Sequence, residues 1–562
     1  MSGINSIEND YLQPTMNGTV DQLPQSAPTD AAVFGHDEEA ESEEEDPTEL
    51  FSAVLASIRL DQLPGFASAV RQRTHPSNES GSSDWIGPIA VGSPLLGSYH
   101  VLFPLDFSDG VRWLLKVPAN GTRDHFDEPA AKALSSEALA MRLLRRETTI
   151  PVPEVFAFDA TLDNELKCPF ILMRFIPGMS LYNCWFDKGI SKDIIQARRT
   201  RTLAEIAAAM VQLDKFSFDQ GGSIVFDDQG HPASIGPTRH VDNQAMLERL
   251  KTDDPDETAL YVELGPHVDP NSFYTSVLDR QPEPDSLSGK GELMLIRLFL
   301  DWIPRSKDGR KEFVLTHPDF DIQNIIVSED GGLQGLIDWD GVAVVPRSLG
   351  NERYPGWLTR DWDPAMYGYR EAMDEGIEPA GLWEDSPETL AFYRATYDRI
   401  MESCLSQEGA SRVCGQDACN SGESGLKSSL SWTRNTLITE NLYIAAENPM
   451  CTGAILDKIF DEIAKVVGKG PYMWSSSRAS KSTDGEVEGA KVRSDDDQVL
   501  DEKSERGDRG HANNKYEPDD FHIYDVACAL ADGNLDQRRM SYLETGFNAL
   551  LSGDMERQRA KP

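Results

Sequence analysis

Several features that would direct a chain to a membrane or to a secreted compartment are missing from this 562-residue sequence. No apolar run approaches the length that spans a bilayer, and the N-terminus lacks the basic, apolar and small-residue order of a signal peptide. Cysteine is scarce, with 7 scattered residues, and the pair Cys414 and Cys419 lacks the spacing of a zinc site. We therefore expect a soluble protein of a reducing compartment, the cytoplasm, that does not bind membranes.

Positive charge is also scarce, because 53 Lys and Arg residues stand against 94 Asp and Glu residues, which gives a formal net charge of −41. This balance argues against nucleic acid binding, which needs a basic surface. Residues 1–50 contain no Lys or Arg, and the segment HDEEAESEEEDP within them is almost purely acidic. A segment of this composition buries too little apolar surface to become ordered, which predicts a disordered tail; an acidic interaction arm is the functional alternative.

Hydrophobic patterning divides the rest of the chain, which has no internal repeat. Between residues 85 and 178 it predicts the order strand, strand, helix, strand, strand, and between 179 and 402 it is largely helical apart from one pair of strands. This order is typical of an α+β fold. The other predicted parts are a helical extension at 51–84 that is split at Pro64, an irregular insertion at 403–428, helices at 429–470, a disordered low-complexity segment at 471–518 and C-terminal helices at 519–562.

The pair of strands encloses the polar segment LTHPDFDIQNIIV, which runs from residue 315 to residue 327. Phosphoryl transfer needs a carboxylate that orients or deprotonates the acceptor hydroxyl, and oxygen ligands for Mg²⁺. Asp319 and Asn324 have the spacing of the His-x-Asp-x-x-x-x-Asn loop of protein kinases, and Asp338 follows one hairpin later, where a metal-binding Asp belongs. The simpler alternative is a turn whose Asp and Asn side chains hydrogen-bond the local backbone.

The segments HPDFDIQNIIV and GLIDWDGVAVVP, followed by RSLGNERYPGWL, resemble the signature segments of fungal members of the aminoglycoside phosphotransferase and choline kinase-like family. The resemblance covers residues 85–402. It implies a bilobal protein-kinase-like fold, with a small antiparallel-sheet N-lobe and a mainly helical C-lobe, that uses ATP and Mg²⁺. It also implies that Asp319 is the catalytic base or the group that positions the acceptor hydroxyl, and that Asn324 and Asp338 are the Mg²⁺ ligands. The role expected for His317 is to brace the loop through hydrogen bonds.

Binding of the ATP phosphates requires a cation from the small sheet. Lys116, at the end of the strand RWLLKVP, occupies the place of the kinase lysine, and Glu137 on the following helix is the best candidate for its partner. Each residue taken alone is more often a surface charge. The other candidates would contact the nucleotide through backbone groups. Residues of the hinge would contact adenine, and residues of an incomplete glycine loop would contact the phosphates. The alternative for this loop is an ordinary β-turn. The candidates are Met173 and Phe175 in the hinge and Gly92, Gly97 and Ser98 in the loop.

The segment after Asp338 contains no Ala-Pro-Glu triplet, which ends the activation segment of protein kinases. Together with the resemblance, this favours transfer of phosphate from ATP to a hydroxyl group of a small molecule. The alternatives are a catalytically inactive kinase fold that acts as a scaffold and, less favoured, a protein kinase. The acceptor, the oligomeric state and the roles of Asp321 and Asp340 stay open. Four aromatic residues either line a pocket for a cationic or amphipathic acceptor or pack in the core: Trp339, Trp357, Trp362 and Tyr367.

Overall fold

The structure is a computed structural model, and two lobes make up the part of the chain that it describes. The acidic tail falls outside this part except for its last two residues, and the low-complexity segment 471–518 falls outside it entirely. The described residues are 49–74, 88–242, 245, 260–305, 310–363, 367–379, 381–414, 432–467 and 522–552.

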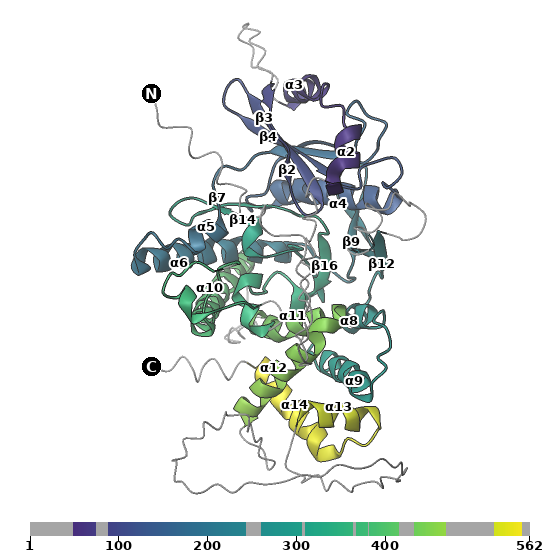
Figure 1. The fold of residues 1–562 in the computed structure, drawn as a ribbon, viewed down its shortest axis with the longest axis vertical. Helices are drawn as coiled ribbons and strands as arrows, with labels where there is room; N and C mark the ends of the chain where they lie inside the picture. The colour runs from purple at the N-terminus through teal and green to yellow at the C-terminus, as the bar shows by residue number, and fades with distance from the viewer. Residues whose placement is uncertain are drawn as a thin grey trace, which may run out of the picture.

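The N-lobe is an antiparallel sheet with helices on both faces (Figure 1). Along β3 every second residue is buried, which is the pattern of a strand with one face on a core. That core includes Val101 and Phe103 and extends to the N-terminal helices α2 (Ser52–Ser57) and α3 (Leu63–Thr74). The strands are β1 (Pro88–Val91), β2 (Leu95–Leu96), β3 (His100–Phe107), β4 (Arg112–Pro118), β5 (Val155–Asp159) and β6 (Phe170–Arg174), in the order β1-β3-β4-β6-β5 with β2 beside β3.

Helix α4 (Glu128–Glu147) packs against the other face of the sheet. It begins after Asp127, whose side chain accepts a hydrogen bond from the Ala130 N–H over 2.9 Å. On the first face, α2 and α3 are separate helices, as predicted, but the break lies at residues 58–62 and not at Pro64. Pro64 is in the first turn of α3, where a missing N–H removes no helical hydrogen bond.

The C-lobe consists mainly of helices, shown from blue to yellow in Figure 1. Helix α10 continues through residues 403–414, so the irregular insertion predicted at 403–428 is wrong for this part, and residues 415–428 lie outside the described residues. The stretch 403–414 has one Gly and no Pro, and nothing in it stops a helix. Among the described residues, no helix combines the length and the apolar character that crossing a membrane requires. The helices are α5 (Leu181–Trp185), α6 (Lys192–Met210), α8 (Pro270–Leu278), α9 (Leu287–Asp301), α10 (Pro387–Cys414), α11 (Thr433–Glu447), α12 (Pro449–Val467), α13 (Ile523–Ala531) and α14 (Gln537–Leu551).

Two small sheets of the C-lobe hold the polar segment between them. In the first, β13 (Phe313–Thr316) pairs with β8 (Ser217–Phe218) and β16 (Ala343–Pro346). In the second, β14 (Ile325–Val327) pairs with β7 (Met179–Ser180) and β15 (Leu333–Leu336). The small antiparallel N-lobe, the mainly helical C-lobe and this loop between strands confirm the predicted α+β, bilobal, protein-kinase-like fold class.

The chain between residues 217 and 264 contains strands where the sequence predicted mainly helix. After β8 come β9 (Ser223–Phe226), β10 (Pro232–Gly236), β11 (Thr238–Val241) and β12 (Tyr261–Leu264), which form the antiparallel pairs β9–β10 and β11–β12. Strand β9 contacts α4, and Leu260, immediately before β12, is fully buried in the N-lobe core. The two strand pairs therefore connect the lobes. They were missed because the segments SIVF, PASIG, TRHV and YVEL do not alternate apolar and polar residues.

Candidate active site

Lys116 is the centre of a charge cluster between the lobes. It lies on β4, paired with Leu102 of β3 and Ile171 of β6. Its Nζ atom is 2.7 Å from Oε1 of Glu137 and 2.9 Å from Oδ1 of Asp338. The side chains of Lys116 and Glu137 are 6% and 3% exposed, whereas that of Asp338 is 49% exposed. The structure therefore brings together three residues that the sequence assigned to nucleotide and metal binding.

The environment of this cluster determines its charge state. Burial lowers the pKa of Lys116, but the charges of Asp338 and Glu137 outweigh burial and raise its pKa, so the ammonium group stays protonated. Burial raises the pKa of Asp338, but the charge of Lys116 prevails and lowers its pKa. For Glu137, burial raises the pKa to about 7 against the opposing charge of Lys116. A protonated lysine beside an ionised aspartate is the charge state that binding of a metal–phosphate unit needs.

One hairpin, formed by β14 and β15, brings Asn324 and Asp338 to the same site. Ile325 pairs with Leu336, and the Ile337 N–H donates to the Asn324 carbonyl over 2.9 Å. Asp338 follows directly, with a φ of 60°, in the left-handed region. This conformation costs a non-glycine residue about 1–3 kcal/mol, and such residues cluster at functional sites, although Asp adopts it more readily than most residues.

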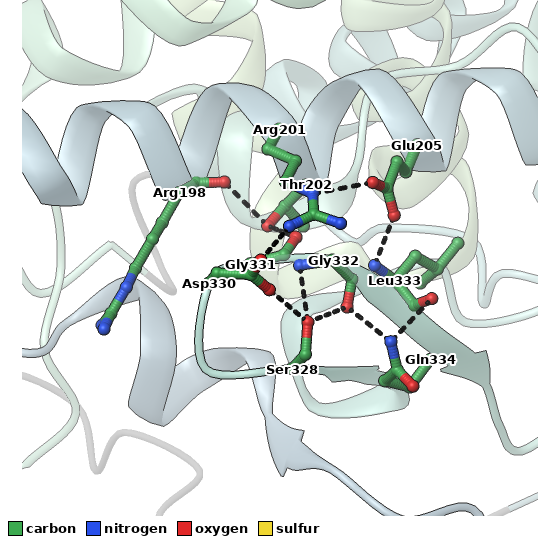
Figure 2. Close-up of polar contacts among 10 residues, drawn as sticks. All are labelled: Arg198, Arg201, Thr202, Glu205, Ser328, Asp330, Gly331, Gly332, Leu333 and Gln334. Carbon is green, nitrogen blue, oxygen red and sulfur yellow. Dashed lines mark hydrogen bonds and ion pairs between the residues drawn. The ribbon is translucent and has the colours of Figure 1, made fainter.

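The turn of this hairpin is fixed to helix α6 (Figure 2). The hydroxyl of Thr202 donates to the Gly331 carbonyl over 2.7 Å, and the carboxylate of Glu205 accepts from the Leu333 N–H over 2.7 Å. Gly331 has a φ of 81°, which a residue with a side chain rarely adopts. Because a rigid helix holds the turn, the two strands that end at the candidate metal ligands are held as well.

Asp319 follows β13 and faces a cavity of about 530 Å³. Its Oδ2 atom accepts hydrogen bonds from Asn324 Nδ2 over 2.8 Å and from Gln323 Nε2 over 3.0 Å. Desolvation and the charge of Asp321 raise the pKa of Asp319, while the hydrogen bond from Asn324 opposes this shift. A carboxylate with a raised pKa that faces a cavity is suited to accept the proton of a hydroxyl group.

Two buried side chains support the loop that carries Asp319. His317, which is 1% exposed, donates from Nε2 to the Ile337 carbonyl over 2.9 Å, and burial lowers its pKa to about 4, so the ring is neutral. Arg353 donates to the His317 carbonyl over 2.9 Å and contacts Glu440 at 2.8 Å. The geometry agrees with the bracing role expected of His317. It adds Arg353, which sequence reasoning missed because its role depends on a contact between residues 36 positions apart.

Asn324 and Asp338 carry donor atoms that suit Mg²⁺. Asn324 uses its Nδ2 atom to bind Asp319, which leaves its amide oxygen for a metal, and half of the Asp338 side chain is exposed. Magnesium in nucleotide sites typically takes one or two protein oxygen atoms and completes its coordination with phosphate oxygens and water. Within the described residues, no group of three or more His, Cys, Asp or Glu side chains is placed to hold a metal. The Asn–Asp pair suits a metal that shares its coordination with a nucleotide.

In the glycine loop, the two backbone N–H groups that were predicted to bind phosphate donate hydrogen bonds within the N-lobe instead. The Gly92 N–H donates to the Pro104 carbonyl and the Gly97 N–H donates to the His100 carbonyl, each over 2.8 Å. These hydrogen bonds favour the alternative of an ordinary β-turn for the two glycines. Ser98 lies in the bend between β2 and β3, and its contact with phosphate stays a prediction.

The predicted hinge residues lie at the end of β6. Met173 pairs with Leu114 of β4 and is 8% exposed, because its side chain packs in the core beneath α4. The Phe175 N–H donates to the Arg112 carbonyl over 3.1 Å. Both residues are thus held to β4 of the N-lobe sheet, and their contact with adenine stays a prediction.

The cavity beside Asp319 has a different aromatic lining from the predicted one. Trp339, Trp357 and Trp362 are at most 6% exposed and belong to the core, and the Tyr367 hydroxyl donates to the Asp385 carbonyl over 2.7 Å. Of the two alternatives for these residues, core packing is therefore right. The aromatic residues that line the cavity are Tyr261, Phe273, Phe320 and Tyr443.

Asp321, whose role the sequence left open, lines the cavity and makes two contacts within the protein. Its Oδ1 atom accepts from the Ile322 N–H over 2.7 Å, and its Oδ2 atom contacts the guanidinium group of Arg360. Asp340 lines the same cavity, and its Oδ2 atom lies 3.8 Å from Nε2 of His100. Burial lowers the pKa of His100 to about 4, so this contact joins a neutral ring to the carboxylate.

Replacing Asp321 with Asn is expected to move the acid limb of the pH profile of ATP turnover to lower pH. The charge of Asp321 raises the pKa of Asp319, so its removal lowers that pKa, and it also leaves the positive charge of Arg360 uncompensated. A general base works when deprotonated, so activity is lost as pH falls through its pKa, and a lower pKa extends activity to lower pH. Initial rates between about pH 4 and pH 8 measure the limb.

Arg360→Gln is the matched control for this pH experiment. It removes the positive charge and keeps Asp321, so it should raise the pKa of Asp319 and move the acid limb to higher pH. Shifts of the same sign in both variants would contradict the assignment of the limb to Asp319.

Comparisons with known proteins bear on this geometry. Residues 107–348 match the phosphotransferase enzyme family, and this span contains the lysine, both loop residues and the hairpin aspartate. A relative from Kluyveromyces lactis, named altered inheritance of mitochondria protein 9, mitochondrial, is 22% identical over 340 residues, which cover 51% of this chain and 54% of that protein. A subtelomeric hrmA-associated cluster protein of Aspergillus fumigatus is 24% identical over 322 residues, which cover 47% of this chain and 60% of that protein.

Solved structures of phosphotransferases resemble the chain weakly. A putative aminoglycoside phosphotransferase from Ralstonia eutropha aligns with a TM-score of 0.35 and 13% identity over 88% of this chain and 99% of that chain. A thermostable mutant of aminoglycoside phosphotransferase APH(4)-Ia, in a ternary complex with AMP-PNP and hygromycin B, aligns with a TM-score of 0.32 and 14% identity over 70% of this chain and 92% of that chain.

Two conclusions follow from the sequence relatives. The chain spans about half the length of the curated relatives it matches, with 54% and 60% of their lengths covered in the two cases above. The cytoplasmic location expected from the sequence is wrong, because relatives from several yeasts are named as mitochondrial proteins. The match of residues 107–348 to the phosphotransferase enzyme family spans both lobes and every residue of the charge cluster.

Proposed function

We propose that this chain is an ATP- and Mg²⁺-dependent phosphotransferase that acts on a hydroxyl group of a small molecule. One observation carries the proposal: Lys116 contacts both Glu137 and Asp338, at 2.7 and 2.9 Å, across the two lobes. The same hairpin that supplies Asp338 holds Asn324, which is hydrogen-bonded to Asp319. An inactive fold has no need for this complete chain of contacts.

Each residue has a distinct task in the proposed reaction. Lys116 would bind phosphate oxygens, held in place by Glu137, and Asn324 and Asp338 would hold Mg²⁺, which neutralises charge on the phosphates. Because Lys116 now contacts Asp338 directly, binding of a metal–phosphate unit has to separate these two side chains. Asp319 accepts the proton of the acceptor hydroxyl, a task for which its raised pKa suits it.

The dimensions of the cavity favour a small acceptor. Its volume of about 530 Å³ falls within the range of small-molecule sites in proteins, roughly 300–1,000 Å³. Residues from both lobes enclose it, including Ser136 of α4 and Tyr443 of α11. A protein acceptor would need an open groove for an extended peptide. The protein kinase alternative is therefore less favoured.

The proposal is tested in two steps with the purified full chain. Titration calorimetry with ATP and Mg²⁺ measures binding, and a panel of hydroxylated metabolites is then screened for ADP release. Binding with acceptor-dependent turnover is expected, and Asp338→Asn, which removes a metal-binding charge without changing side-chain size, should lose most of the Mg²⁺-dependent affinity. Absence of MgATP binding would refute the function, whereas binding without turnover for any acceptor would favour the scaffold alternative.

A further inference from the structure

The phosphates of a nucleotide need hydrogen-bond donors beyond those of the glycine loop. The N–H groups of Gly92 and Gly97 already donate to carbonyls of the N-lobe, each over 2.8 Å. Lys116 supplies one positive charge, but a triphosphate presents many acceptor oxygens, and ionised acceptors form strong hydrogen bonds. A donor side chain beside Lys116, on the same face of the sheet, is therefore suited to phosphate binding.

His100 lies on the same face of the sheet as Lys116. It is the first residue of β3 and stands just after the glycine loop. Lys116 of β4 pairs with Leu102 of β3, and residues directly opposite each other on antiparallel strands share a face. His100 stands two residues before Leu102, so it shares this face as well. Val101, between them, is instead buried in the core that includes α2 and α3.

The His100 ring reaches the charge cluster between the lobes. It lines a small cavity of about 20 Å³ together with Lys116, Glu137 and Asp340. Its Nε2 atom lies 3.8 Å from Oδ2 of Asp340, as Lys116 Nζ lies 2.9 Å from Oδ1 of Asp338. Strands β3 and β4 therefore each present one nitrogen atom to the segment after the β14–β15 hairpin, where the proposed function places the metal and the phosphates.

The chemistry of the imidazole ring suits the role of a donor. The ring carries at least one N–H group in either of its charge states. An ionised carboxylate only accepts hydrogen bonds, so Asp340 opposite Nε2 favours the tautomer with its hydrogen on Nε2. The distance of 3.8 Å is longer than a hydrogen bond, so this contact does not itself use the N–H group.

We propose that His100 donates a hydrogen bond from Nε2 to a phosphate oxygen of the nucleotide, in place of the backbone N–H groups that the glycine loop uses internally. This inference rests on the proposed function. Lys116 and His100 hold the phosphates from the N-lobe, the first through its charge and the second through a directional hydrogen bond. Asn324 and Asp338 serve the metal from the C-lobe.

The experiment measures nucleotide affinity by titration calorimetry with the purified full chain. His100→Phe keeps a ring of similar size but has no N–H group, and it is expected to weaken MgATP binding by about 10–100-fold, the range for a hydrogen bond to a charged group. Adenosine, which has no phosphate, should bind the wild type and this variant within about twofold of each other. His100→Gln, which keeps an N–H donor, should recover most of the affinity for MgATP.

His231→Phe is the matched control for this experiment. The His231 ring is half exposed between β9 and β10 and lies 3.7 Å from the carboxylate of Asp227. The same substitution at this position should leave the affinity for MgATP within about twofold of the wild type.

Several outcomes would overturn the inference. An MgATP affinity of His100→Phe close to that of the wild type would do so, and so would an equal loss in His100→Gln. Equal losses for MgATP and adenosine would assign His100 a structural role instead. If His100→Phe does not fold, His100→Leu takes its place under the same criteria. Failure of the wild type to bind MgATP refutes the proposed function, so the two failures are distinguishable.

Discussion

Asp319→Asn is expected to lower ATP turnover by about 10²–10⁴-fold, the range over which general-base catalysis contributes to rates. The substitution removes the proton acceptor but keeps a side chain of the same size and shape. One oxygen remains to accept the hydrogen bond that Asn324 now donates over 2.8 Å, so the loop should keep its geometry. The affinity for MgATP should stay close to that of the wild type, because the lysine and both candidate metal ligands are unchanged.

Gln323→Ala is the matched control for this prediction. It removes the second hydrogen bond to Oδ2 of Asp319, which spans 3.0 Å, and leaves the carboxylate in place. We expect less than about tenfold loss of turnover, since a single hydrogen bond contributes roughly 0.5–1.5 kcal/mol. Steady-state rates and nucleotide affinity are measured for each variant. Turnover in Asp319→Asn within a factor of about two of the wild type would remove Asp319 from the mechanism.

The parts of the site that the sequence predicted are those that depend on local chain geometry. Asp319 and Asn324 lie on one loop, and Asp338 ends a hairpin whose register is set by a turn, so fixed spacing in the sequence becomes fixed spacing in space. Lys116 and Glu137 come from a strand and the helix directly after it, which pack together in the N-lobe. In both groups of residues, the members come from the same loop or from neighbouring elements of the chain. A pattern of residue types in the sequence is therefore enough to find them.

The parts that the sequence missed depend on contacts between distant segments. The cavity beside Asp319 is enclosed by α4, the β11–β12 pair and α11, and no periodicity in any of them indicates that they meet. Trp357 and Trp362 illustrate the same limit, because an aromatic residue near the catalytic loop packs equally well in a core or against a ligand. Which of the two occurs is decided by the long-range packing of the C-lobe helices.

Lys116→Met is expected to destabilise the protein by about 3–5 kcal/mol and to abolish MgATP binding. The variant leaves Glu137, which is 3% exposed, without its positive partner, and an uncompensated buried charge costs this much. In the wild type, the charge of Lys116 lowers the pKa of Glu137. When the variant removes this charge, the pKa of Glu137 rises above its present value of about 7. The pKa of Glu137 in the folded variant then lies further above the unfolded value of about 4.3 than the pKa in the folded wild type does.

The sign of the pH dependence follows from this shift. A group whose pKa is higher in the folded state binds protons more tightly when the protein is folded. Its contribution to stability is therefore fully present below the pKa of the unfolded state and is lost as pH rises through the pKa of the folded state. The difference in unfolding free energy between Lys116→Met and the wild type should therefore be larger at about pH 8 than at about pH 6. Urea denaturation at both pH values measures it.

The double variant Lys116→Met with Glu137→Leu separates the two consequences of losing the lysine. Replacing both members of a buried pair with apolar residues of similar size is often neutral for stability, so most of the lost stability should return. Nucleotide binding should not return, because no cation remains to meet the phosphates. MgATP binding by either variant would contradict the role of Lys116. Recovery of stability without MgATP binding would mean that the fold does not need the Lys116–Glu137 pair and that the pair serves to bind the phosphates.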